Sequence, residues 1–358
     1  RSSCCRRRQE PCKGGMRMNG YQRVKAALRG EPSDCRPVML HNFQNAVCEA
    51  GITFAEFRED PHKAAEAFIR STEKYDLDGV FIDFDTATLA GACGCKVVKP
   101  LDKAAVATGS ILDDIQDVFG LKPVNIEHDA AVAHWLETSR LVGEYFGDEK
   151  YVRCNCDQAP FSLASMLRGS QELMMDLIDE DYEEEIREVL SYCQKATEQF
   201  VRLAGQTGAH GVSNGDSVAG PAMISPAMYR KFGIPYEKLI IDAAHENGTD
   251  YILHICGDTT PILETFPELG VDAMELDHKT DRQKMHDILA DHTTVCGNLD
   301  PSGVFLMGTE ENVRKETFRL LETYRDSHRL ILCSGCALST DTPERNMRAF
   351  VECARSYR

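Results

Sequence analysis

A histidine and a cysteine stand two residues apart in the stretch HICGDTTP, residues 254–261, and Cys336 lies in SGCAL nearer the end of the chain. The apolar run YIL that precedes His254 is typical of a buried strand. Residues two apart on a strand share a face, so the side chains of His254 and Cys256 can approach one ion. Imidazole plus two thiolates is a zinc-binding set that leaves a fourth position open for substrate. We therefore predict a metal site at His254, Cys256 and Cys336.

This interpretation has alternatives, because a chain with 15 cysteines and 11 histidines can contain His-x-Cys by chance. Lone buried cysteines usually behave as small apolar residues. Cys333 and Cys336 could instead form a redox pair. Glu275 or Asp277, in the next strand-like segment, could be the fourth ligand of the metal or could contact the metal ligands without binding the ion.

The elements that would carry these residues alternate regularly between strand-like and helix-like stretches. The strand-like segments are residues 36–40, 78–85, 151–155, 210–214, 250–256, 271–277, 293–298 and 328–333. Eight such units in one chain predict a single (β/α)₈ barrel, and no G-x-G-x-x-G turn supports a doubly wound sheet. The stretch 96–150 is too long for one connecting helix. We expect it to insert extra helices over the barrel mouth, between the second and third strands.

Polar residues follow almost every strand-like segment, where the chemistry of a barrel is located. We predict that Asp83, Asp216 and Asp277 are catalytic and that Asn42 and Asn298 bind a cofactor. Asp85 could also position a substrate or transfer a proton. The simpler alternative is that these side chains cap turns and helices, which Asp and Asn commonly do.

Composition limits the partners. The formal net charge is −17, which disfavours nucleic acid and anionic membranes, because both require basic surfaces. No apolar run is long enough to span a membrane and no signal peptide is visible. We interpret the cysteines as reduced thiols of a cytoplasmic protein in an anaerobic setting. The basic segment 1–17 lacks apolar periodicity and is expected to be a disordered or artificially added tail, so the domain would comprise residues 18–358.

From about Gly20 to Arg355 the chain resembles the uroporphyrinogen decarboxylase superfamily. The matching segments, in order, are RVKAALRGEPSDCRPV, APFSLASMLRG, GDSVAGPAMISPAMYRKFGIPYEKLI, CGNLDPSGVFLMG and SGCALSTDTPERNMRAFVE. They resemble that family's opening helix and first strand, its G-P-F-T-L-A-S, D-S-x-A-G and G-N-L-D-P segments, and its closing T-P-x-E-N block. The resemblance implies one barrel domain.

Two departures point to one branch of that superfamily. The arginine-bearing loop that binds substrate carboxylates in the decarboxylases is replaced by HNFQNAVCEAG, residues 41–51, and the late histidine of G-H-G is replaced by Cys336. Both changes resemble the zinc-containing, corrinoid-dependent methyltransferases, which carry H-x-C and a late G-C. That resemblance implies Zn²⁺ on His254, Cys256 and Cys336. It also implies a corrinoid co-substrate presented by a corrinoid protein, and a small methyl acceptor or donor, with a thiol expected.

Decarboxylation of a tetrapyrrole or another small acid is the alternative function, and it needs no metal. A non-catalytic zinc or corrinoid-binding role for the same fold is a third. The sequence does not fix the direction of methyl transfer.

Overall fold

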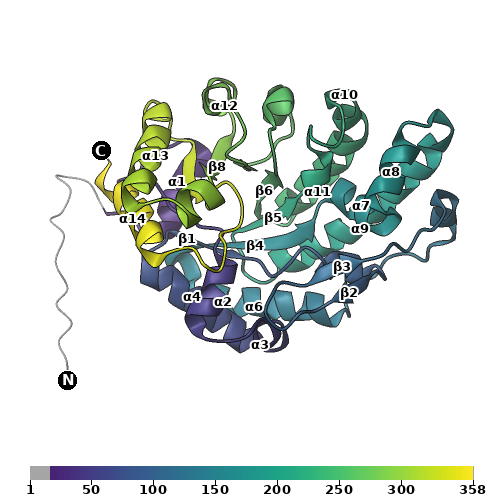
Figure 1. Ribbon diagram of the computed structural model, residues 1–358, viewed down its shortest axis with the longest axis horizontal. Helices are drawn as coiled ribbons and strands as arrows, with labels where there is room; N and C mark the ends of the chain where they lie inside the picture. Colours follow the sequence, from purple (N-terminus) through teal and green to yellow (C-terminus); the bar gives the residue numbers. More distant parts are fainter. Residues whose placement is uncertain (1–16, 358) are drawn as a thin grey trace.

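A computed structural model describes residues 17–357, and parallel strands at its centre form one sheet in the order β1-β4-β5-β6-β7-β8-β9. These strands are β1 (Gly79–Ile82), β4 (Tyr151–Gln158), β5 (Gly211–Gly215), β6 (Asp250–Ile255), β7 (Ala273–Leu276), β8 (Thr294–Leu299) and β9 (Leu330–Ser334). The sheet curls on itself, and the helices lie around it (Figure 1). The predicted barrel is confirmed in this architecture.

The ring is closed by a short extended segment rather than by a full strand. Val38 forms an isolated parallel bridge with Leu332 of β9, and Met39 N donates to Leu332 O at 3.0 Å. On the other side, Asp78 N, just before β1, donates to Val38 O at 2.8 Å. Residues 37–39 therefore join β9 to β1 and occupy the place of an eighth strand.

The prediction of a strand over residues 36–40 is wrong in extent. Pro37 has no N–H to donate, and Val38 N donates at 2.8 Å to the side-chain Oδ2 of Asp78 instead of to a neighbouring strand. The ladder therefore cannot extend beyond a single bridge. The segment still leads directly to His41.

The helices connect successive strands and cover the outside of the sheet. The α-helices are α1 (Gly20–Arg29), α2 (Phe43–Ala50), α3 (Phe54–Glu59), α4 (Pro61–Tyr75), α5 (Thr88–Ala92), α6 (Ala130–Phe146), α7 (Pro160–Arg168), α8 (Ser170–Leu177), α9 (Glu183–Gly205), α10 (Pro226–Met228), α11 (Ile234–Glu246), α12 (Arg282–Leu289), α13 (Glu310–Thr323) and α14 (Glu344–Ser356). The 3₁₀- and π-helical segments are η1 (Ile115–Gly120), η2 (Gly147–Glu149), η3 (Glu180–Tyr182), η4 (Ser217–Ala219), η5 (Tyr229–Gly233), η6 (Thr260–Glu268) and η7 (Pro301–Leu306).

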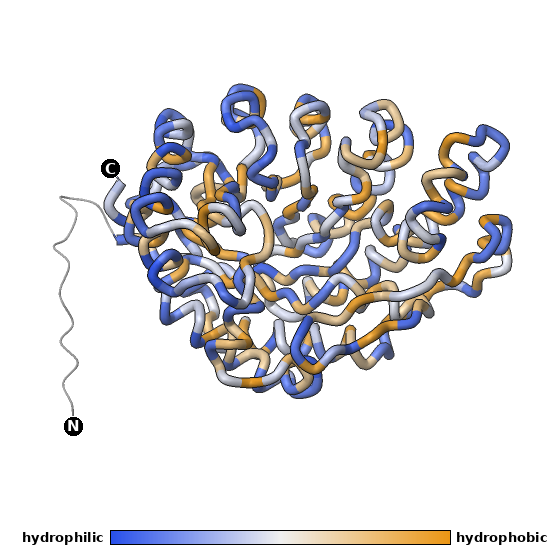
Figure 2. Tube along the Cα trace, viewed as in Figure 1, coloured by the Kyte–Doolittle hydropathy of each residue, from blue (hydrophilic) through white to orange (hydrophobic). Residues whose placement is uncertain are grey.

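Hydrophobic and hydrophilic residues alternate along the outer helices (Figure 2), as amphipathic helices require when one face packs on a sheet. Local signals fix where several of them begin. In α1 the Asn19 side chain accepts from Gln22 N while the Gln22 side chain accepts from Asn19 N, a reciprocal cap. Within residues 17–357 no helix is both long enough and apolar enough to cross a membrane.

The insertion between β1 and β4 differs from its prediction. It begins with an antiparallel hairpin, β2 (Lys96–Val98) and β3 (Val106–Thr108), rather than with a helix. The β-branched residues of these strands favour extended backbone. The rest of the insertion contains η1 and then α6, which packs on α4 and α9 as an ordinary outer helix. The prediction of extra helices there is therefore wrong for the first part of the stretch.

Candidate metal centre and substrate cavity

His254, Cys256 and Cys336 lie together at the carboxyl end of the barrel. β6 places His254 on its inner face, Cys256 follows the strand directly, and Cys336 lies in the loop after β9. His254 Nε2 is 2.8 Å from Cys256 Sγ, and the two sulfur atoms are 3.8 Å apart. Within the described residues these three form a group whose ligand atoms all lie within 4.8 Å of one another. The structure thus brings together the three residues predicted as metal ligands.

The chemistry of this donor set fits zinc. His254 Nδ1 lies 3.1 Å from the backbone oxygen of Glu275, which leaves Nε2 directed toward the sulfur atoms. The hydrogen bond from Cys336 and the charge of His254 lower the pKa of Cys256 to about 3, whereas the same hydrogen bond raises the pKa of Cys336. The two sulfurs therefore share one proton in the metal-free protein. A divalent cation would stabilise both as thiolates.

Backbone contacts hold the Cys336 loop in place. Gly335 N donates to Leu299 O at 2.7 Å, and Leu338 N donates to His41 O at 2.8 Å. A Cβ at position 335 would lie 2.7 Å from His278 N, closer than real contacts permit, so this approach requires glycine. The loop is thereby fixed between the ends of β8 and the closing segment.

The metal group borders a cavity of about 290 Å³ inside the barrel mouth. Its polar lining comprises His41, Gln44, Asp83, Asp85, Thr86, Arg153, Asn155, Asp157, Gln158, Ser217, His254, Cys256, Glu275 and Cys336. The metal group lies on the side of β6 and β9, and Asp83, Asp85 and Asp157 lie at the ends of β1 and β4 on the facing side of the ring. A small molecule in this cavity would contact both sides.

Glu275 occupies the floor of this cavity and is fully buried. It forms an ion pair with Arg153 of β4, whose guanidinium also lies 3.6 Å from the centre of the Phe81 ring. Burial raises the pKa of Glu275, but the charges of Arg153, His254 and His41 outweigh that effect and hold it well below the usual range. Glu275 is therefore a carboxylate at neutral pH.

His41 lies between Glu275 and Asp83 and so connects the two sides of the cavity. Its Nε2 lies 2.7 Å from Asp83 Oδ2, and Asn155 Nδ2 donates to the other oxygen of Asp83 at 2.9 Å. Burial lowers the pKa of His41, but hydrogen bonds with Asp83 and Glu275 outweigh burial and raise it to about 9. His41 is thus a cation with two carboxylate neighbours. Asp83 lines the cavity, and its predicted catalytic role stays a prediction.

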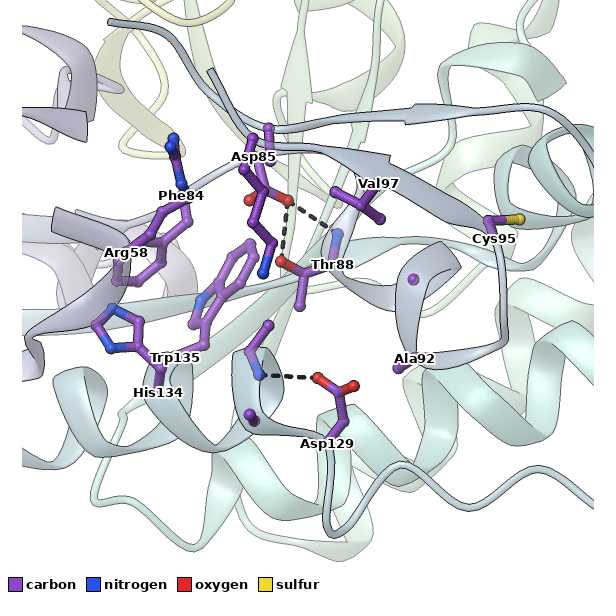
Figure 3. A pocket seen from close by; sticks show the side chains of 15 residues that line it. Arg58, Phe84, Asp85, Thr88, Ala92, Cys95, Val97, Asp129, His134 and Trp135 are labelled. Atoms are coloured by element: carbon purple, nitrogen blue, oxygen red, sulfur yellow. Dashed lines mark hydrogen bonds between the residues drawn. The ribbon is translucent and has the colours of Figure 1, made fainter. Parts of the chain in front are cut away.

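Asp85 separates this cavity from a second one of about 390 Å³, bordered by α5, α6 and the β2–β3 hairpin. Its Oδ1 accepts from Thr88 N at 2.9 Å and from Thr88 Oγ1 at 3.0 Å (Figure 3). Trp135 and His134 of α6 line the second cavity, as Figure 3 also shows. Asp85 therefore belongs to the walls of both cavities.

Asp277 and Asp216, the other predicted catalytic residues, are not among the residues that line the substrate cavity. Asp277 Oδ2 accepts from Gly257 N at 2.9 Å and so holds the turn that follows Cys256. Asp216 is fully buried, accepts from Ser162 N at 2.7 Å at the start of α7, and contacts Glu237. Their catalytic assignment stays a prediction, and the contacts indicate positioning of loops and helices.

Asn42 and Asn298, the predicted cofactor-binding residues, are also absent from the lining of the cavity. Asn42 Nδ2 donates to Ser71 Oγ at 2.9 Å, toward α4. Asn298 Nδ2 donates to Asp277 O at 3.2 Å, and its Oδ1 is buried without a hydrogen-bond partner. Both residues lie near the ends of the expected segments but face neighbouring elements.

Arg153 is a residue of the site that was not predicted from the sequence. A charged residue in the otherwise buried strand YVRCN was the available signal, because a buried arginine requires a carboxylate partner. Cys93 and Cys95 also stand two residues apart, as do Cys154 and Cys156, but neither pair belongs to a candidate metal group within residues 17–357. The predicted tail, residues 1–17, lies outside the described residues except for Arg17.

Comparison with known proteins agrees with this architecture. The family model described as "Uroporphyrinogen decarboxylase (URO-D)" matches residues 20–357, so the chain belongs to the uroporphyrinogen decarboxylase family. The methylcobamide:CoM methyltransferase MtbA of Methanosarcina acetivorans is 26% identical over 342 residues, which cover 94% of this chain and 98% of that protein. A uroporphyrinogen decarboxylase of Thermus thermophilus is also 26% identical, over 92% of this chain and 96% of its own length.

A solved methyltransferase structure from Methanosarcina mazei superposes with a TM-score of 0.84 at 22% identity, over 94% of this chain and 98% of that one. This likeness supports the same barrel fold. The full-length matches to methyltransferases identify the chain as an enzyme of the methyltransferase type. Since a decarboxylase of the same family is equally identical, the contacts in the site have to show why decarboxylation is disfavoured.

Proposed function

We propose that this enzyme is a zinc-dependent methyltransferase that moves a methyl group between a corrinoid and a small molecule, with a thiol as the acceptor. The observation that carries the proposal is the group of one imidazole and two thiols that borders the cavity in the barrel mouth. Methyltransferase relatives with methylcobamide and CoM in their names support it.

The chain's own residues have distinct tasks in this proposal. Cys256, Cys336 and His254 would hold Zn²⁺, and Glu275 orients His254 through its backbone oxygen. When bound, zinc would lower the pKa of a substrate thiol and keep its sulfur nucleophilic. The S–CH₃ bond would form as the Co–C bond breaks, with that electron pair left on cobalt and the thiol proton released to solvent. Asp83 and His41 would orient the substrate from the facing side of the cavity.

The alternative decarboxylase activity fits the cavity less well. Substrates with several carboxylates need free cations, but Arg153 and His41 are already paired with Glu275 and Asp83, and His254 contacts Cys256. Soon after the closing segment, residues 37–39, the chain forms α2, FQNAVCEA, which contains no arginine. An anionic tetrapyrrole would therefore meet uncompensated negative charge.

The same proposal implies a partner protein and a cellular location. The corrinoid would be delivered at the barrel mouth by a corrinoid protein in the cytoplasm, since the cavity opens at the carboxyl ends of the strands. A strongly acidic chain suits a protein partner better than nucleic acid or an anionic membrane.

Metal content and methyl transfer together test the proposal. Protein purified anaerobically without added metal should contain one zinc per chain and should demethylate methylcobalamin when a thiol is supplied. The triple variant H254A/C256A/C336A should lose both. Stoichiometric zinc in that variant, or full activity of zinc-free wild-type protein, would reject the proposal.

A further inference from the structure

The side of the cavity that faces the metal group carries three carboxyl groups. Asp83 and Asp85 follow β1, and Asp157 lies near the end of β4; each is at most 5% exposed. Asp157 has φ of 60°, a left-handed conformation that is uncommon for a residue with a side chain. Its carboxylate accepts from Leu89 N at 2.6 Å and from Gln158 Nε2 at 3.1 Å, which fixes its position beside Asp85.

Within the described residues these carboxyl groups have too few cations. His41 lies within 4.0 Å of Asp83, but no lysine, arginine or histidine nitrogen lies that close to Asp85 or Asp157. Arg153 is paired with Glu275. Arg58 and Lys99 line the second cavity; the charge of Asp85 acts on Arg58 from beyond 4.0 Å, and the Arg58 guanidinium donates its hydrogen bonds to the backbone oxygens of Lys103 and Pro100.

One carboxylate oxygen of this group lacks a hydrogen bond from the described residues and is open to a ligand. Asp85 Oδ1 takes its hydrogen bonds from residues 87 and 88, whereas none is found for Asp85 Oδ2 in residues 17–357. Buried carboxylates without a counter-charge are costly, and burial raises the pKa of both Asp85 and Asp157.

We propose that the small methyl acceptor carries a cationic, amine-type group at the end remote from its sulfur, and that this group docks between Asp85 and Asp157. The inference rests on the proposed function, which places the sulfur at the metal group. An ammonium supplies the counter-charge that the cavity lacks and donates hydrogen bonds to the free carboxylate oxygen. A sulfonate or carboxylate at the same end would meet like charge, so the preferred substrate differs in charge from coenzyme M.

Three thiols of equal chain length test the sign of this charge: 2-aminoethanethiol, 2-mercaptoethanol and 2-mercaptoethanesulfonate. With methylcobalamin as donor, kcat/KM should fall in that order, with at least a tenfold difference between the amine and the sulfonate. Calorimetric titration of the zinc-loaded enzyme without corrinoid should give dissociation constants in the same order. A preference for the sulfonate in both measurements would overturn the inference and leave the proposed function intact.

Variants separate recognition of the substrate's charged end from differences in the acidity of the thiols. In Asp85→Asn and in Asp157→Asn, the ratio of kcat/KM for the amine to that for the hydroxyl compound should fall about tenfold. Because the intrinsic reactivity of each thiol is the same with every protein, comparing this ratio between a variant and the wild type removes it. Asp129→Asn is the matched control, because Asp129 caps α6 in the second cavity and does not line the substrate cavity. Its ratio should equal that of the wild type.

The outcomes are distinguishable. An unchanged ratio in both aspartate variants, with thermal midpoints near that of the wild type, would reject docking at Asp85 and Asp157. If no thiol is methylated or bound by zinc-loaded wild-type enzyme, the proposed function itself fails, and this inference fails with it.

Discussion

His41 and His254 approach the same oxygen atom. Glu275 Oε1 lies 3.5 Å from Nδ1 of His41 and 3.5 Å from Nδ1 of His254. One imidazole belongs to the candidate metal group and the other to the hydrogen-bonded chain that ends at Asp83 and Asn155. A change of charge at the metal group is therefore transmitted electrostatically to the facing side of the cavity through a single buried carboxylate.

Removal of either member of the Glu275–Arg153 pair should destabilise the fold. Glu275→Gln leaves a buried guanidinium without its anion, and Arg153→Met leaves a buried carboxylate without its cation. Each should lower the free energy of unfolding by about 3–5 kcal/mol, whereas the double variant should lose clearly less than the sum. Urea unfolding of the four proteins measures this coupling. Strictly additive losses would show that the two side chains do not depend on each other.

Cys336→Ala should damage catalysis more than folding. The side chain lies in a loop beside Cys256, so its loss would remove a proposed metal ligand without opening a core cavity. Methyl transfer should fall by orders of magnitude while the thermal midpoint shifts by only a few degrees.

The neighbouring Cys333→Ala is the matched control for this variant. Cys333 is fully buried in β9, where burial raises the pKa of its thiol well above the usual range. This variant should lose about 1 kcal/mol of stability and keep its zinc and its activity. Metal analysis, kcat/KM and thermal melting of both variants make the comparison. Near-full activity of Cys336→Ala, with zinc lost from Cys333→Ala, would reassign the third ligand.

Uroporphyrinogen should not be a substrate. The cations that line the cavity are already paired, and α2 offers no arginine to bind propionate or acetate side chains. Anaerobic incubation followed by chromatography of the porphyrins should show unchanged starting material. Formation of coproporphyrinogen at ordinary enzymatic rates would restore the decarboxylase alternative.

The Asp216–Glu237 pair should make stability depend on pH. Burial raises the pKa of Asp216 to about 6 in the folded protein, compared with about 3.9 in an unfolded chain. Because the folded state holds the proton more tightly, this contribution to stability is complete below about pH 4 and is lost as pH rises through about 6. Asp216→Asn keeps the acceptor for Ser162 N but cannot ionise.

The measurement is the difference in unfolding free energy between wild type and Asp216→Asn across this pH range. The variant should gain up to about 3 kcal/mol relative to the wild type between pH 4 and pH 7. A constant difference would show that Asp216 does not titrate in this range. Turnover of the same variant tests the catalytic assignment made from the sequence, since a purely structural Asp216 predicts little change in kcat.

Much of the metal group could be predicted from the sequence because its geometry is local. The two-residue spacing of His254 and Cys256 on an apolar strand fixes their common face, and the barrel brings the loop of Cys336 to the same end. Asp83 was predicted for the same reason, as a residue at a strand end.

The remainder of the site depends on contacts that local patterns do not contain. Arg153 and Glu275 meet across the barrel, so their pairing follows from closure of the ring rather than from spacing in the chain. Asp277, Asn42 and Asn298 follow or end strand-like segments as predicted, but each has its side-chain hydrogen bonds with a neighbouring loop or helix. Position at a strand end therefore gave the right region of the barrel without giving the direction of each side chain.

The short closing segment at residues 37–39 makes one seam of the barrel weaker than the others, since a single bridge replaces a full ladder. His41 closely follows this closing segment, and the hydrogen bond from Leu338 N to His41 O joins it to the loop of Cys336. An ion held by Cys336 and by the residues at the end of β6 would connect the loop after β9 to the opposite part of the barrel mouth. We expect this single-bridge contact to open more readily when the ion is removed with a chelator, so amide hydrogen exchange at Met39 and Leu332 should become faster.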